Sequence, residues 1–132
     1  MTIHTNNQII HGDACTELKK LETASVDLII TDPPYLVNYR DRLGRTIAND
    51  DNADAVLPAI PEMARVLKDG GYMLLFCGWV AVDKFASAWA EAGLRTVGQI
   101  VWTKNYASRS YHTECRHESA WLLAKGKPEE AR

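Results

Sequence analysis

The 132-residue sequence has few cysteines and no long apolar segment, and both shortages exclude classes of protein. Its three cysteines include no C-x-x-C pair, so neither a disulfide framework nor a zinc ribbon is expected, and a cytoplasmic location is favoured. The longest apolar stretch, residues 72–82, is interrupted by a glycine and is far shorter than the roughly 20 residues of a membrane-spanning helix. The first residues also lack the basic and apolar regions of a secretory signal, so no membrane partner is expected.

Positive charge is not in excess either, because 15 Lys and Arg residues face 17 Asp and Glu residues. No overall field draws this chain onto nucleic acid, so any such contact must be local. The sequence also contains no G-x-G, the glycine turn through which many folds approach a bound nucleotide. A nicotinamide-dependent oxidoreductase, which needs that turn, is therefore not expected.

What the sequence does contain is an alternation of short apolar runs and amphipathic stretches, which is typical of α/β folds. Strands are expected at residues 8–11, 26–31, 72–77, 95–103 and 119–124, and helices after Asp13, over 56–67 and over 82–89. Pro58 and Pro61 predict that the second helix begins late or is bent. Glycines at 70–71 and 93 are expected to end the second and third helices.

The segment 26–31 is a nearly continuous run of β-branched and aliphatic residues, as expected of a parallel strand buried on both faces. The predicted core consists of six strand residues: Ile29, Ile30, Leu74, Phe76, Val101 and Leu122. Two polar segments, 38–52 and 104–118, are expected to be loops.

The tetrapeptide Asp32-Pro33-Pro34-Tyr35 directly follows this predicted strand. Parallel strands of open α/β sheets deliver their carboxyl ends to the crevice where ligands bind, and two prolines hold the flanking side chains in place. A plain turn that ends the strand is the alternative, since Asp and Pro both favour turns.

With this motif the chain resembles the DNA amino-methyltransferases, which transfer a methyl group from S-adenosylmethionine to N6 of adenine or N4 of cytosine. The resemblance covers nearly the whole chain, and it is closest to the circularly permuted subgroup with the DPPY motif, in which the catalytic half comes first. The matching segments, in order, are 9–14, 25–35, 65–76, 101–104 and 117–126.

The resemblance assigns catalysis to the four motif residues. The Asp32 carboxylate and the Pro33 carbonyl accept the two hydrogens of the amino group, which aims the nitrogen lone pair at the methyl donor. Pro34 fixes the position of Tyr35, and the ring of Tyr35 stacks on a base that has been swung out of the duplex.

The resemblance also assigns cofactor contacts to Asp13 and Asp32. Asp13 has an equally physical alternative role, as the cap of the helix that begins beside it. Five basic residues of the two predicted loops are candidate contacts with DNA phosphates: Arg40, Arg42, Arg45, Lys104 and Arg109. Ordinary solvated surface charge explains these residues almost as well, because acidic residues lie among them.

The fold implied is an incomplete doubly wound, Rossmann-like methyltransferase sheet with a C-terminal antiparallel strand pair. Residues 1–126 are expected to form the catalytic part of one domain, without the glycine-rich cofactor turn or the target-recognition segment, and residues 127–132 a tail or linker. In the family, two strands of the missing half separate the strand at 8–11 from the strand at 26–31. The sheet would then be completed by further chain, by a second polypeptide or by self-association.

Adenine N6 is favoured over cytosine N4, because cytosine enzymes of this type more often carry Ser at the first motif position. Two alternatives remain open at this point. One is a non-catalytic remnant or subunit that needs a partner to bind the cofactor, and the other is a protein-glutamine methyltransferase, whose related motif usually begins with Asn. A metal site is not expected, since His112, Cys115 and His117 fit no common zinc spacing and lack a fourth ligand.

Overall fold

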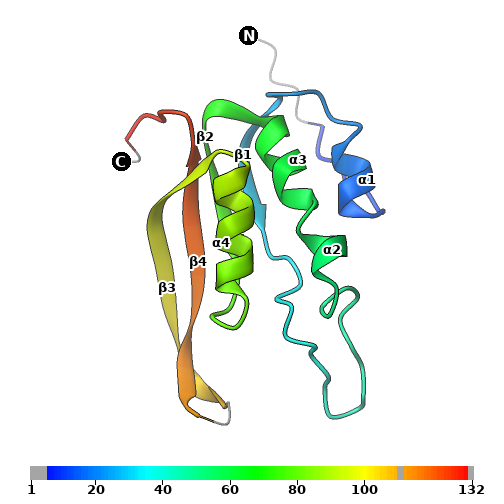
Figure 1. Ribbon diagram of the computed structural model, residues 1–132, viewed down its shortest axis with the longest axis vertical. Helices are drawn as coiled ribbons and strands as arrows, with labels where there is room; N and C mark the ends of the chain where they lie inside the picture. The colour runs from blue at the N-terminus through cyan, green and yellow to red at the C-terminus, as the bar shows by residue number, and fades with distance from the viewer. Residues whose placement is uncertain (1–5, 110–111, 131–132) are drawn as a thin grey trace.

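The computed structural model describes residues 6–109 and 112–130. The elements in order are α1 (Ala14–Leu18), β1 (Val26–Thr31), α2 (Ala53–Val56), α3 (Ala59–Val66), β2 (Leu67–Phe76), α4 (Val82–Glu91), β3 (Leu94–Arg109) and β4 (Glu114–Lys125). The strands form one open sheet in the order β1-β2-β4-β3, in which β1 and β2 are parallel and the other two pairs are antiparallel. Figure 1 shows α3 and α4 in front of this sheet. The α/β architecture and the antiparallel strand pair are thereby confirmed.

The core lies between the helices and one face of the sheet. Met73, Leu75 and Leu123 of the sheet pack there with Ile60 of α3 and Phe85 of α4, and each of these side chains is at most 1% exposed. Burial of this kind stabilises a fold by about 2 kcal/mol for each large apolar side chain.

The opposite face of the sheet is open, which corrects the expectation that β1 is buried on both faces. Leu28 and Ile30 are 54% and 65% exposed. Ile30, Leu74 and Leu122 are paired in one row across three strands, so they share this open face. The physical reason is that the helices of the described residues cover one face only.

The predicted core is therefore wrong at Ile30 and at Val101, which is 50% exposed on the edge strand β3. Leu74, Phe76 and Leu122 are half-buried on the open face, and Ile29 packs at the margin of the core.

The strand predicted at residues 8–11 does not form, and Ile9 and Ile10 are exposed. No described strand lies beside this segment, so its backbone groups have no ladder to join. The helix that follows is also shorter than predicted, because α1 ends at Leu18.

The proline prediction is confirmed: α2 ends at Val56 and α3 begins at Ala59, with Pro58 between them. The glycine prediction is right for α4, since Gly93 follows its end with a φ of 83°. It is wrong for α3, which ends at Val66, and Gly70 lies inside β2 with a φ of 82°.

The segment 104–118, predicted as a loop, is instead mostly hairpin. The ladder of β3 and β4 continues from Trp102–Glu118 to Arg109–Glu114, with an irregularity between Thr103 and Ser108. Antiparallel strands pair through the backbone, so a polar sequence can extend a hairpin that apolar residues have begun. The segment 38–52 does lack helices and strands, apart from one bridge between Arg40 and Thr46.

The predicted tail is partly attached to the sheet, because the Tyr72 hydroxyl donates a hydrogen bond of 2.7 Å to the carbonyl of Glu129. Residues 131 and 132 of that tail lie outside the described residues. Across the described part of the chain, every helix is too short to cross a bilayer.

Candidate active site at the end of strand β1

The motif Asp32–Tyr35 directly follows β1, at the carboxyl end of a parallel strand. Asp32 is exposed, and no ion pair within residues 6–109 and 112–130 neutralises its carboxylate. Tyr35 is half-buried, and the backbone at Leu36 turns sharply with a φ of 60°. The acidic group is therefore held at the surface of the fold and is available to a ligand.

Two hollows meet at this motif, and Asp32, Pro33 and Pro34 line both of them. The first, which we name the helix-side cavity, has a volume of about 410 Å³ and lies between the motif, α1, α2 and α3. The second, the loop-side chamber, has a volume of about 720 Å³ and lies between the motif, the segment 37–50 and the strands β2 and β3. Both volumes fall in the range of small-molecule sites.

The helix-side cavity is mainly apolar, with Leu18, Ile60 and Phe85 in its wall and Asp13 at its margin. The Asp13 carboxylate accepts hydrogen bonds from the backbone N–H of Thr16 at 2.9 Å and from its hydroxyl at 3.1 Å. The capping interpretation of Asp13 is thus confirmed, and the cap also places Asp13 in the wall of the cavity. Its contact with a cofactor stays a prediction.

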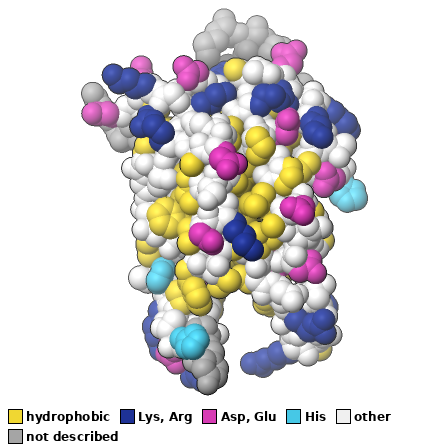
Figure 2. Space-filling model, in the orientation of Figure 1, with side chains coloured by type: hydrophobic (Ala, Val, Ile, Leu, Met, Phe, Trp, Pro, Cys, Tyr) yellow, Lys and Arg dark blue, Asp and Glu magenta, His cyan; other side chains and the backbone are white. Residues whose placement is uncertain are grey.

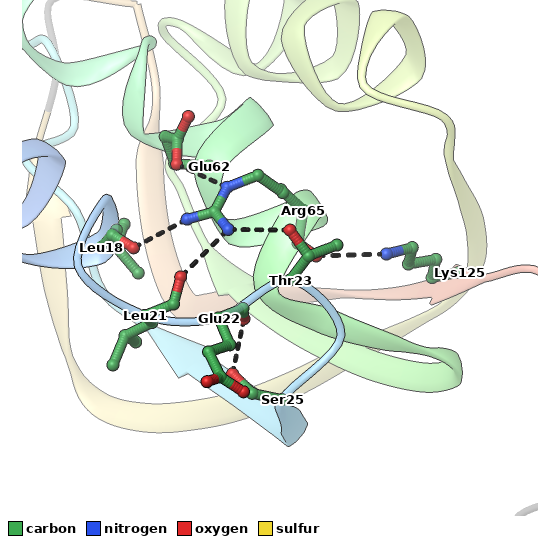
Figure 3. Close-up of polar contacts among 8 residues, drawn as sticks. All are labelled: Leu18, Leu21, Glu22, Thr23, Ser25, Glu62, Arg65 and Lys125. Carbon is green, nitrogen blue, oxygen red and sulfur yellow. Dashed lines mark hydrogen bonds and ion pairs between the residues drawn. The ribbon is translucent and has the colours of Figure 1, made fainter.

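Arg65 of α3 holds α1 in place from its other end (Figure 3). Its guanidinium donates to the carbonyls of Leu18 and Leu21 at 2.9 and 3.0 Å and to the Thr23 hydroxyl at 3.1 Å, and it pairs with Glu62 at 2.9 Å. Sequence reasoning missed this residue, since a basic residue near a helix end is usually solvated.

The loop-side chamber is rich in aromatic rings, and the sequence alone assigned only Tyr35 to it. Tyr39, Phe76 and Trp102 also line it, and the rings of Phe76 and Trp102 lie 5.0 Å apart at 58°. Strand alternation could have placed Phe76 and Trp102 on one face, but not beside the motif.

Burial raises the pKa of the Tyr35 hydroxyl above its usual range, and the negative charge of Asp32 raises it further. Tyr35 is therefore neutral at physiological pH. A neutral ring of this kind can stack on a flat ligand and at the same time help to orient the neighbouring acid.

The predicted phosphate contacts lie on two arms, the β3–β4 hairpin and the segment after β1. Figure 2 shows a notch between these arms, with Lys and Arg side chains on both. Arg40 and Arg42 are exposed. Arg45 pairs with Asp41 at 2.5 Å, and Arg109 pairs with Glu114 at 3.3 Å, although both arginines keep most of their surface in solvent.

Lys104 is placed differently from the other predicted contacts. Its side chain is 8% exposed, and its ammonium lies 2.7 Å from Glu118 and 2.6 Å from the Ser108 hydroxyl. The hydrogen bond to Glu118 raises the pKa of Lys104. A structural role at the base of the hairpin fits this geometry better than a contact with phosphate.

Cys115 and His117 are neighbours on β4, and the Cys115 thiol donates to the His117 carbonyl at 3.3 Å. Among the described residues, no group of three or more His, Cys, Asp and Glu side chains is arranged to hold a metal ion.

Comparison with known proteins decides the family. A family model described as DNA methylase matches residues 26–131, which include the motif and all four strands. The chain belongs to the DNA methylase family. YubD of Escherichia coli (strain K12), which carries the name of a methylase, is 47% identical to this family member over 122 residues, 92% of this chain and 54% of YubD.

The DNA adenine methyltransferase YhdJ of the same organism is 46% identical over 68 residues, which are 51% of this chain and 23% of YhdJ. Among solved structures, the complex of M1.HpyAVI with SAM superposes with a TM-score of 0.63 at 27% identity, over 92% of this chain and 57% of M1.HpyAVI. This DNA methylase family member thus spans about half the length of YubD and of M1.HpyAVI.

Proposed function

We propose that this chain forms the catalytic half of a DNA amino-methyltransferase of the permuted DPPY subgroup, which methylates adenine N6 in preference to cytosine N4. One observation carries the proposal: Asp32 and its two prolines line two adjoining hollows of ligand size. Transfer of a methyl group from a donor to a base needs two adjacent binding sites, with the reacting nitrogen held where the two sites meet.

The helix-side cavity suits S-adenosylmethionine, which supplies an electrophilic methyl group when bound. Its apolar walls fit an adenine ring, and the Asp13 and Asp32 carboxylates at its margin fit the polar and positively charged groups of that cofactor. The assignment of Asp13 and Asp32 as cofactor contacts rests on this fit and on the resemblance.

The loop-side chamber suits an extruded base. Tyr35 stacks on the base, while the Asp32 carboxylate and the Pro33 carbonyl accept the two amino hydrogens. The nitrogen lone pair would then face the helix-side cavity directly; a methyl group passing to it would leave its bonding electron pair on the sulfur of the donor, and the proton given up by the amine would pass to solvent by way of Asp32. Pro34 keeps the stacking ring at a fixed distance from the acid.

Backbone contacts with DNA are assigned to Arg40, Arg42, Arg45 and Arg109 on the two arms that flank the notch. These arginines are exposed, and the ion pairs of Arg45 and Arg109 are surface pairs that cost little to exchange for a phosphate. Lys104 serves instead to hold the hairpin through Glu118.

The preference for adenine rests on the acidic first residue of the motif and on the likeness of half the chain to a DNA adenine methyltransferase. A cytoplasmic location accords with a DNA substrate and with three free cysteines. We assign residues 1–126 to the catalytic part of the domain and residues 127–132 to a tail or linker.

A second polypeptide segment completes the sheet in the active protein. The chain matches about half of YubD, and the open face exposes apolar side chains on both edge strands, including Leu28, Ile30, Ile100 and Trp102. We assign this face to a segment equivalent to the unmatched half of YubD, which covers it with apolar side chains. Self-association of the chain is the competing outcome.

The test is methyl transfer from labelled S-adenosylmethionine to unmethylated DNA, with nucleoside analysis to separate N6-methyladenine from N4-methylcytosine. Wild type is expected to give N6-methyladenine, and Asp32→Asn to lose at least a hundredfold in rate, because a neutral amide accepts the amine hydrogens more weakly and does not stabilise the positive charge that develops on nitrogen. Asp51→Asn, an exposed change of the same kind, is the matched control.

Equal rates for wild type and Asp32→Asn would remove Asp32 from the mechanism. Methylation of a protein glutamine in place of DNA would support the glutamine methyltransferase alternative. If the chain shows no methyl transfer and calorimetry detects no binding of the cofactor, the result would support the non-catalytic subunit.

A further inference from the structure

A groove lies on the surface of the helix layer, between α4 and the pair α2 and α3, and we name it the helix-layer groove. It has a volume of about 790 Å³. The half-buried Leu57, Ala88 and Ala92 line it, together with the exposed Pro58 and Pro61. Figure 2 shows hydrophobic side chains on this face of the molecule, with Asp and Glu side chains around them. The groove thus has an apolar floor that is open to solvent.

The margin of the helix-layer groove is acidic. Asp54, Asp83 and Glu91 line it and are exposed, whereas Lys84 is the lining cation among the described residues. No ion pair formed within residues 6–109 and 112–130 involves any of these four side chains. Because three carboxylates outnumber one ammonium group here, the groove attracts cationic side chains and repels phosphates, so neither nucleic acid nor anionic lipid fits it.

The helix-layer groove is separate from the hollows at the catalytic motif. Val56 and Ile60 of the α2–α3 segment line the helix-side cavity, whereas Leu57 and Pro61 of the same segment line the groove. The two spaces share no lining residue, and the α2–α3 segment lies between them. A ligand in the groove therefore leaves the motif accessible, so the groove is a candidate for an interaction other than the reaction itself.

We propose that the helix-layer groove binds a basic amphipathic helix of a partner protein. An apolar floor with a charged margin is the composition of a protein–protein interface, and a helix that lies in a groove places its apolar face on such a floor. The short side chains of Ala88 and Ala92 let a second helix come close to α4. Asp83 and Glu91 are eight residues apart on α4, so they lie about 12 Å apart along its axis and can pair with cations two turns apart on the partner.

Charge complementarity favours such a partner over a second copy of this chain. The exposed arginines of the described residues lie in the segment 38–52 and on the β3–β4 hairpin, and neither of these is helical. A second copy therefore presents no basic helix to the groove. The occupant is a segment of another protein, with leucine-like side chains on one face and Lys or Arg along its edges.

The experiment measures, by fluorescence anisotropy, how three labelled peptides bind to the full chain at physiological ionic strength. The first is a helical peptide of Leu, Ala and Lys with its leucines on one face. The second carries Glu in place of every Lys, and the third has the composition of the first in an order that leaves no apolar face. Wild type is expected to bind the first peptide at least tenfold more tightly than the other two, because only the first matches both the floor and the margin of the groove.

Glu91→Lys places the test within the groove. Glu91 is the last residue of α4, where a negative charge opposes the helix dipole and a positive charge is favourable. The melting temperature of Glu91→Lys is therefore expected to equal or exceed that of wild type. Its affinity for the first peptide is expected to fall by about tenfold, because a repulsive pair replaces an attractive surface pair. Glu22→Lys, an equal change of charge at an exposed residue outside the groove, is the matched control.

Equal losses of affinity in Glu91→Lys and Glu22→Lys would overturn the proposal, because overall charge would then explain binding. Equal binding of the three peptides by wild type, or no binding of the first, would overturn it as well. If wild type binds no peptide and Glu91→Lys alone shifts the sedimentation of the chain toward monomer, the groove is an interface between copies and the proposal is wrong. The groove contains no residue of the motif, so each of these results leaves the proposed function to its own assay.

Discussion

Asp32 stays available to a ligand because of the two residues that follow it. An aspartate at the end of a strand commonly accepts a hydrogen bond from the backbone two residues later. Pro33 and Pro34 have no N–H, so the local backbone offers Asp32 no donor. The sequence could therefore predict the exposed acid from the motif alone. It could not predict that Asp50 is buried, at 2% exposure, because that burial depends on how the segment 37–50 folds back.

The single residue Cys77 gives a prediction about how stability depends on pH. The thiol is buried just after β2, and burial raises its pKa to about 11. The unfolded chain ionises its thiols near pH 8.5, so the neutral buried thiol contributes stability that is complete below that pH and is lost as the pH rises toward 11. We expect wild type to lose about 2 kcal/mol of unfolding free energy through this group, measured by urea denaturation between pH 8 and pH 11.

The unfolding free energy of Cys77→Ala is expected to be lower than that of wild type at pH 8, because the substitution leaves a cavity. It is also expected to decrease less than that of wild type between pH 8 and pH 11. Cys115→Ala, at a half-buried cysteine of the hairpin, is the control for general effects of thiol loss. Parallel pH curves for wild type and Cys77→Ala would contradict the assignment.

At the scale of elements, the sequence predicted well where apolar periodicity was strong. Val26–Thr31 and the start of α4 at Val82 agree with the predicted bounds, and Pro58 breaks the helix as expected. Prediction failed where pairing depends on distant residues. The hairpin continues through polar residues because its backbone is already in register, and residues 8–11 form no strand because no neighbour is in place.

The short helix α1 depends on Arg65, and this dependence can be tested. Arg65→Ala removes three hydrogen bonds to the α1 region and one ion pair, so we expect a loss of about 2 kcal/mol in unfolding free energy. Because α1 carries Asp13 at its start, the variant should also bind S-adenosylmethionine more weakly in calorimetry.

Lys20→Ala provides the comparison, since Lys20, two residues beyond the end of α1, forms an exposed pair with Glu17 of that helix. That change is expected to alter stability by less than about 0.5 kcal/mol. Equal losses from the two substitutions would show that Arg65 contributes no more than an ordinary surface charge.

At the scale of the whole molecule, the open sheet face is the main departure from the predicted core. Ile30, Leu74 and Leu122 were expected to be buried, and their sequence pattern is that of a two-sided sheet with helices on both faces. This apolar pattern is therefore typical of a sheet that is covered on both faces, whereas the described residues cover one face only. This is why the α/β architecture and the antiparallel strand pair could be predicted while the burial of individual residues could not.

Exposed apolar surface of this extent predicts association. We expect the chain alone to sediment as a concentration-dependent mixture, and Ile30→Lys to shift it toward monomer at little cost in stability, because Ile30 is 65% exposed. Leu75→Lys, on the buried face of the neighbouring strand, should instead unfold the chain. A wild type that remains monomeric at all concentrations would argue against association through this face.

Strand β1 is one of the two edge strands of the sheet, and its last residue, Thr31, is bonded directly to Asp32. A polypeptide that pairs with the unpaired edge of β1 is expected to restrict the motion of Asp32 as well. Docking of a second segment along this strand is therefore expected to raise the rate of methyl transfer above that of the chain alone, because it would hold Asp32 more rigidly.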